Sequence, residues 1–149
     1  DPAPDTAPNT DPGMDSRMDA ALLEQLHAID GLDMGSGLQR VPGDPAKWLS
    51  LLRRFDDQHG DDVARLDALI AAQTIEDAKA LVHGFNSAAG NLGLVHLQAT
   101  ASAIEEQLNR QDWPASHMSV IVMTGKLSAE YRLFHEALAR IRPGALAPD

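Results

Sequence analysis

The strongest constraint on the fold is the stretch 75–93, where apolar and polar side chains repeat at the spacing of a helix. The apolar residues recur every three or four positions: Ile75, Ala78, Val82, Phe85, Ala89 and Leu92. Because each residue turns an α-helix by about 100°, these side chains share one face and predict a helix packed on a core. A second stripe, shifted by one residue, lies on the flank of that face and borders solvent: Lys79, His83, Asn86 and Gly90.

The flanking stripe places an imidazole on a rigid helix. His83 has small neighbours, with Ser87 on the same flank and Ala88 and Gly90 close by. Small neighbours leave the ring accessible to another protein. Neutral imidazole is a competent nucleophile toward phosphorus. His83 is therefore the candidate reactive residue of the chain.

Composition excludes several kinds of partner. The chain has 149 residues, 44% of them hydrophobic and only 4% aromatic, with a formal charge of −10 and no cysteine. Its length suits one domain with a single core. An acidic chain repels nucleic-acid phosphates and anionic lipid, so we expect neither nucleic acid nor a membrane surface as a partner. We also expect no thiolate metal site, no membrane-spanning segment, no signal peptide and a cytoplasmic location.

The chain divides into a linker, a helical domain and a tail. Residues 1–17 are rich in Pro, Asp and Thr and predict a flexible linker, although an expression leader would have the same composition. Residues 18–142 form the expected domain, and 143–149 the tail. Within the domain, 18–29 is a short amphipathic stretch, and one helical turn is expected across Met34–Arg40.

Four long amphipathic stretches follow, which we predict as helices over 44–72, 74–91, 94–111 and 114–143. Asp44 suits the N-cap of the first and Pro45 its first position, while Gly93 marks the end of the second. Gly60 interrupts the first stretch, and we predict one long helix through it rather than two. The seam of the last helix is predicted as Ile121, Leu127, Tyr131, Phe134, Leu138 and Ile141.

Four such helices with short connections predict an all-α, antiparallel four-helix bundle, with short additional helical segments at its N-terminus. Thr74 is expected to cap the second helix, with Asp77 in a capping-box position. Neither strand alternation nor an internal repeat is present in the sequence.

The residues around His83 also resemble a known family. The run from His83 to Gly93 reads His-x-x-Asn-Ser-x-Ala-Gly-Asn-Leu-Gly, and Leu97, Ala101 and Ile104-Glu105 follow it. This is similar to the histidine phosphotransfer (HPt) domain, with its pattern His-x-Leu-Lys-Gly-x-x-x-x-x-Gly, often ending Ala-Gly-Asn-x-Gly, and its later Leu-Glu pair. Upstream residues resemble the lead-in of HPt modules in hybrid sensor kinases: Gly31-Leu32-Asp33, Gly37-Leu38, Gly43-Asp44 and Leu51-Leu52-x-x-Phe55. The resemblance covers roughly residues 30–140.

The resemblance implies a phosphorelay intermediate. His83 would accept a phosphoryl group from the aspartyl phosphate of one receiver domain, in the parent hybrid kinase, and pass it to an aspartate on a response-regulator receiver. The receivers would bring the acidic pocket and the Mg²⁺, so this chain would need no cofactor of its own. It would act as a phosphohistidine carrier without an ATP-binding domain, as a monomer when isolated, in the cytoplasmic part of a membrane-bound sensor kinase.

Two positions depart from the family pattern. Asn86 stands where the family has Lys, and Ser87 where it has Gly. Asn86 retains a hydrogen-bond donor without the charge, and Lys79, four residues before His83, would replace part of that cation. The Ser87 hydroxyl would donate to a phosphoryl oxygen, and Gly90 would keep the surface flat for the receiver.

Three alternatives remain open at this point. The loss of the lysine at Asn86 motivates a degenerate HPt-like domain that docks receivers without carrying phosphate. A metal- or haem-binding bundle would need paired Glu-x-x-His motifs, which the sequence lacks. A kinase dimerisation helix pair would have an acidic residue after the histidine, where this chain has Gly84. We expect no metal site, because the remaining histidines stand too far apart for a helical pair: His27, His59, His96, His117 and His135.

Overall fold

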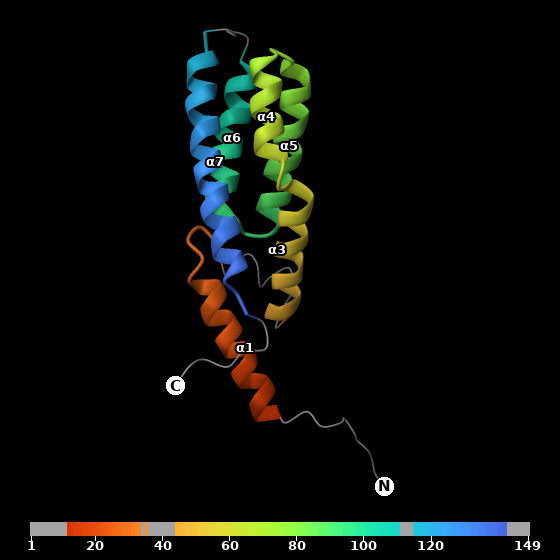
Figure 1. Ribbon diagram of the computed structural model, residues 1–149, viewed down its shortest axis with the longest axis vertical. Coiled ribbons are helices and arrows are strands. Elements are labelled where there is room, and N and C mark those ends of the chain that lie inside the picture. Colours follow the sequence, from red (N-terminus) through yellow and green to blue (C-terminus); the bar gives the residue numbers. More distant parts are fainter. Residues whose placement is uncertain (1–11, 34, 36–43, 111–114, 143–149) are drawn as a thin grey trace.

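The computed structural model describes residues 12–33, 35, 44–110 and 115–142, and these are almost entirely helical. The helices are α1 (Pro12–His27), α3 (Pro45–His59), α4 (Asp62–Ala71), α5 (Ile75–Asn91), α6 (Val95–Asn109) and α7 (His117–Ala139). Helices α4 to α7 lie side by side, with α3 below α4 and α1 at the lower end (Figure 1). The prediction of an all-α, antiparallel four-helix bundle is confirmed.

One continuous hydrophobic core runs through the bundle. The seam predicted for 75–92 faces it, because Ala78, Val82, Phe85 and Ala89 are all buried in α5. The buried face of α7 repeats every three or four residues: Val120, Thr124, Leu127, Tyr131, Phe134 and Leu138. Such spacing is typical of helices packed nearly parallel in a bundle. Ile121, predicted to lie in this seam, is 43% exposed, and Val120 and Thr124 take its place in the core.

The long helix predicted over 44–72 is wrong, because the chain breaks it into α3 and α4 at Gly60-Asp61. The backbone of Gly60 is right-handed helical, but a Cβ there would lie 2.9 Å from the Asp56 carbonyl oxygen, so a larger residue would need a small shift. The hydroxyl oxygen of Tyr131, on α7, lies 3.4 Å from the same carbonyl oxygen. These contacts end α3 one turn after Asp56 and let α4 start in a new direction.

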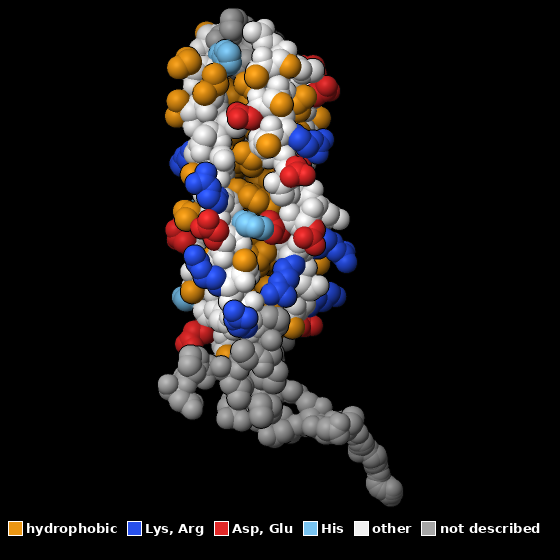
Figure 2. Space-filling view, viewed as in Figure 1, with side chains coloured by type: hydrophobic (Ala, Val, Ile, Leu, Met, Phe, Trp, Pro, Cys, Tyr) orange, Lys and Arg blue, Asp and Glu red, His pale blue; other side chains and the backbone are white. Residues whose placement is uncertain are grey.

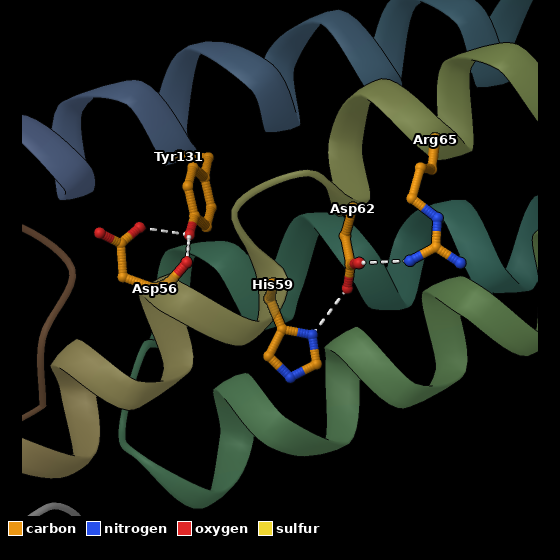
Figure 3. Close-up of polar contacts among 5 residues, drawn as sticks. All are labelled: Asp56, His59, Asp62, Arg65 and Tyr131. Carbon is orange, nitrogen blue, oxygen red and sulfur yellow. Dashed lines mark hydrogen bonds and ion pairs between the residues drawn. The ribbon is translucent and has the colours of Figure 1, made fainter.

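Side-chain bonds hold the junction between α3 and α4 (Figure 3). His59, the last residue of α3, contacts Asp62 at the start of α4, with 2.6 Å between Nδ1 and Oδ2. The guanidinium of Arg65 lies 3.4 Å from the other oxygen of Asp62. Asp62 is 6% exposed, and a buried carboxylate is tolerated in a protein when it is paired in this way.

The N-terminal segment closes the lower end of the bundle. Leu32 and Leu94 form an isolated antiparallel β-bridge. On either side of it, Val95 N donates to the Gly31 carbonyl oxygen at 2.8 Å, and Asp33 N donates to the Gly93 carbonyl oxygen at 2.7 Å. These bonds attach the N-terminal segment to the α5–α6 turn. Gly93 has a φ of +79°, which confirms that glycine ends the second predicted helix. The buried indole of Trp48, on α3, donates from Nε1 to the Leu92 carbonyl oxygen at 3.1 Å.

Helix ends differ from several predictions. Helix α1 begins at Pro12, six residues before the predicted start of the helical domain, while residues 1–11 and the tail 143–149 lie outside the described residues. The N-cap at Asp44 is confirmed, because its Oδ1 accepts from Lys47 N at 3.0 Å. Thr74 stands at the N-cap of α5 but makes no side-chain capping bond. The turn expected across Met34–Arg40, of which only Gly35 is described, and the start at Pro114 cannot be compared with the structure.

We expect Gly31→Ala to destabilise the fold. Gly31 has a φ of +85°, and an added Cβ would lie 2.7 Å from His96 Nδ1. A left-handed backbone costs an alanine about 1–2 kcal/mol, so the free energy of unfolding in urea should fall by at least that amount.

Gly125→Ala is the matched control, because Gly125 lies inside α7 and nothing is within 4 Å of its added Cβ. It should raise the free energy of unfolding by about 0.5–1 kcal/mol, the difference in helix propensity between the two residues. Equal effects of the two substitutions would contradict the role given to Gly31.

Candidate functional site

The candidate nucleophile stands on the middle of α5, on the side facing α6. Its side chain is 68% exposed, whereas the neighbouring Val82 is completely buried. The apolar seam holds one face of the helix in the core, so the next position along the chain must turn outward. The ring of His83 is thus presented to solvent by a helix that cannot rotate without exposing its seam.

A carboxylate on α6 fixes the orientation of this ring. Nδ1 of His83 lies 2.8 Å from Oε2 of Glu105. The other carboxylate oxygen, Oε1, accepts a hydrogen bond of 3.1 Å from Nδ2 of Asn86. One carboxylate therefore contacts two residues of α5 that are three positions apart. The three side chains form a single network across the two helices.

The protonation of the network follows from its carboxylate. Burial raises the pKa of Glu105, but the hydrogen bonds from Asn86 and His83, together with the charge of His83, outweigh it and bring the pKa below the usual range. Glu105 is therefore ionised near neutral pH and can only accept, so Nδ1 of His83 carries the proton. In the neutral ring, the lone pair then sits on Nε2, at the opposite edge of the imidazole.

The other predicted site residues lie around this network in different ways. Lys79 is half-buried, and its ammonium pairs with Glu76 on the same helix at 3.1 Å. Ser87 is exposed one turn after His83. Gly90 is covered in part by Gln98 of α6, because an added Cβ would lie 2.5 Å from the Nε2 atom of that side chain. The close packing of α5 on α6 therefore explains the glycine at position 90 without any contact to a receiver domain.

Glu105 is the site residue that the sequence prediction left out. It lies in the Ile104-Glu105 pair after the histidine run, but the helical period relates only positions within one helix and so did not connect it with His83. An α5–α6 hairpin folded at Gly93 places residues at similar distances before and after the turn opposite one another. His83 and Glu105, which lie 10 residues before and 12 residues after Gly93, are in contact in this way. An acidic residue at that register position is a signal that hairpin geometry could have found.

A second imidazole has a similar local geometry on α7. His135 is 57% exposed, and its Nδ1 lies 2.7 Å from Oδ2 of Asp56 on α3. The Tyr131 hydroxyl donates to the other oxygen, Oδ1, at 2.5 Å and so orients the carboxylate from the core side (Figure 3). Exposure and a carboxylate partner therefore do not single out His83 by themselves.

The surroundings of His135 are acidic. His135, on α7, lines a surface groove with residues of α3, α4 and the turn between them, including Asp57, Asp61 and Asp67. On the face of the bundle drawn in Figure 2, hydrophobic side chains (orange) follow the long axis, and acidic (red) and basic (blue) side chains lie on both sides of them. Three carboxylates beside Asp56 repel an incoming phosphoryl anion, and Arg132 is the cation that lines the same groove. The setting of His135 therefore disfavours phosphoryl chemistry.

In the described part of the chain, His, Asp and Glu side chains form no group of three or more that could hold a metal ion. Among the helices of residues 12–142 that are described, none has the length and apolarity needed to cross a bilayer.

Comparison with known families gives one match. A family model described as Hpt domain matches residues 50–142, which is more than half of the chain. The matched segment contains α4 to α7 and both residues of the contact between His83 and Glu105. Neither a curated protein nor a solved structure matches the chain.

The lone tyrosine allows the α3–α7 contact to be tested. Burial, and then the hydrogen bond to Asp56 and the charge of that carboxylate, raise the pKa of Tyr131 far above its usual value. The tyrosinate absorbance of the folded protein should therefore not rise near pH 10, where a free tyrosine ionises (~10). Because the unfolded chain ionises there and the folded chain does not, stability should decline as the pH rises above that value.

Asp56→Asn serves as the comparison in this titration. Removing the charge takes away one cause of the raised pKa, so tyrosinate should appear at lower pH than in the unaltered protein. Ionisation of Tyr131 at the ordinary pH in the folded, unaltered protein would contradict the contact.

Proposed function

This chain belongs to the Hpt domain family, and we propose that His83 is its phosphoacceptor. Hpt domains carry a phosphoryl group on a histidine in phosphorelays and interact with receiver domains. The assignment to His83 is supported by the hydrogen bond from Nδ1 to Glu105 on a ring that is 68% exposed, together with the run from His83 to Gly93 that resembles the family pattern and that His135 lacks. This bond leaves Nε2 as the atom with a lone pair on the accessible edge.

The proposed step is an in-line transfer between two proteins. The Nε2 lone pair forms a bond to the phosphorus of a receiver's aspartyl phosphate, while the bond from phosphorus to the aspartyl oxygen breaks and its electrons leave with the carboxylate. No proton has to move, because Nδ1 keeps its proton throughout. The ring gains positive charge as the N–P bond forms, and the Glu105 carboxylate stabilises that charge across 2.8 Å.

The reverse step passes the phosphoryl group to the aspartate of a response-regulator receiver. Phosphoryl transfer depends mostly on positioning and charge stabilisation, so a well-placed imidazole suffices on this side. We expect the receivers to bring the Mg²⁺ that neutralises the transferring oxygens. In this proposal the chain is a carrier between the receiver of a hybrid kinase and that of its response regulator.

The histidine assignment can be tested with two phosphodonors. Phosphoramidate is a small donor that needs no partner, and receiver domains loaded from labelled acetyl phosphate test the relay itself. Labelled phosphate should appear on the unaltered chain in an acid-labile, alkali-stable form, as phosphohistidine does, and should fall to background in His83→Gln.

His135→Gln is the matched control, because that ring has comparable exposure and the same type of carboxylate contact. It should be labelled as the unaltered chain is. Label that persists in His83→Gln would rule out the proposal. A receiver that binds the chain but never transfers phosphate, together with no labelling by phosphoramidate, would favour the docking-only alternative.

Glu105→Gln tests the stabilising carboxylate. The amide keeps the size of the side chain and an acceptor oxygen but loses the charge. A hydrogen bond to a charged group is worth about 1.5–3 kcal/mol, so labelling by phosphoramidate should slow by about tenfold or more. Glu106→Gln, at the next and exposed position of α6, should leave the rate unchanged. A rate unaffected by Glu105→Gln would remove Glu105 from the mechanism.

A further inference from the structure

One of the two residues that depart from the family pattern makes a specific contact in this chain. Asn86 is half-buried on α5, and its Nδ2 donates to Oε1 of Glu105 at 3.1 Å. The same carboxylate accepts from Nδ1 of His83 through Oε2, at 2.8 Å. Asn86 thus lies one helical turn after His83 and is also linked to it through the Glu105 carboxylate. The position that loses the lysine has a hydrogen-bonding role.

The carboxylate needs this second contact to stay in place. A glutamate side chain on a helix surface has several rotatable bonds, and Glu105 is 22% exposed, so water competes for both of its oxygens. A carboxylate held at one oxygen can still rotate about its last bond. Hydrogen bonds at both oxygens, one from each α5 residue, fix its plane and direct Oε2 at the imidazole.

Lys79, the cation predicted to lie near the site, is paired with a carboxylate of its own helix. The Lys79 ammonium lies 3.1 Å from Glu76, on the side of α5 toward its N-terminus. Asn86 carries no charge, so it cannot neutralise a phosphoryl group as a lysine would. The direct electrostatic role of the family lysine is therefore not reproduced by Asn86.

We propose that Asn86 is a positioning residue that acts on His83 through Glu105. This inference rests on the proposed phosphoacceptor role of His83. Asn86 holds the Glu105 carboxylate, the carboxylate holds the proton on Nδ1, and the lone pair therefore stays on Nε2. The charge of the transferring phosphoryl group is then neutralised by the partner receiver. In this account Asn86 contributes to phosphoryl transfer, and its presence in place of the lysine does not indicate a domain that only docks receivers.

The first test measures the tautomer of the unphosphorylated ring, and so does not depend on any transfer reaction. The ¹⁵N chemical shifts of the His83 ring in the full chain report the fraction of molecules with the proton on Nδ1. Asn86→Ala should lower that fraction toward the value of a free imidazole, and the pKa of Glu105 should rise because one hydrogen bond that lowers it is gone.

Asn109→Ala is the matched control for this measurement. It removes an asparagine amide from an exposed position of α6, one turn after Glu105, and should leave both quantities unchanged. If Asn86→Ala moves neither the tautomer fraction nor the pKa of Glu105, the proposal is overturned. If phosphoramidate fails to label the unaltered chain, the proposed function fails, while the tautomer measurement still decides whether Asn86 positions the ring.

A double-mutant cycle then separates action through Glu105 from direct contact with the phosphoryl group. Asn86→Ala alone should slow labelling by phosphoramidate about fivefold, as expected for the loss of one hydrogen bond. In a Glu105→Ala background the same substitution should have no further effect, because the residue through which it acts is missing. A further fivefold loss in that background would show direct action on the phosphoryl group and overturn the proposal.

Discussion

The packing of α5 against α6 is the contact on which the site depends. The two helices fold back on one another at Gly93, whose φ of +79° suits glycine. This antiparallel register places Glu105 opposite His83 and Gln98 opposite Gly90. A change of one residue in the register would turn Glu105 by about 100° around its helix and away from the imidazole. The turn therefore sets the chemistry of a residue that lies nearly three helical turns away from it.

The lower end of the bundle supports that turn from outside. Residues 31–33 bond to it through their backbone, and the indole of Trp48 caps the Leu92 carbonyl oxygen. Helix α1 and Trp48 lie before residue 50, where the family match begins, yet Leu22, Leu26 and Trp48 are buried in the same core. The N-terminal segment is therefore an integral part of this fold, and it buttresses the hairpin that holds the site.

His83 and His135 are both exposed imidazoles with a carboxylate hydrogen-bonded to Nδ1. They share this contact, but carboxylates line the groove beside His135. The Asp56 carboxylate also accepts from Tyr131, at the place where α3 ends. That cluster has a structural role at the junction of α3 and α4. Local geometry thus has to be weighed with the surrounding charge and the family to which the segment belongs.

The sequence alone determined the helical class, the face of α5 that is buried and the residue that stands beside it, because the 3.6-residue period fixes which side chains share a face. It did not determine the break at Gly60, where contacts from Tyr131 on a distant helix add to a weak local preference. It misjudged Ile121, because a helix rich in apolar residues on several sides has no single obvious seam. Only the tertiary structure joined Glu105 to His83 and Asn86, since contacts between helices depend on turn geometry and register, which local periodicity does not encode.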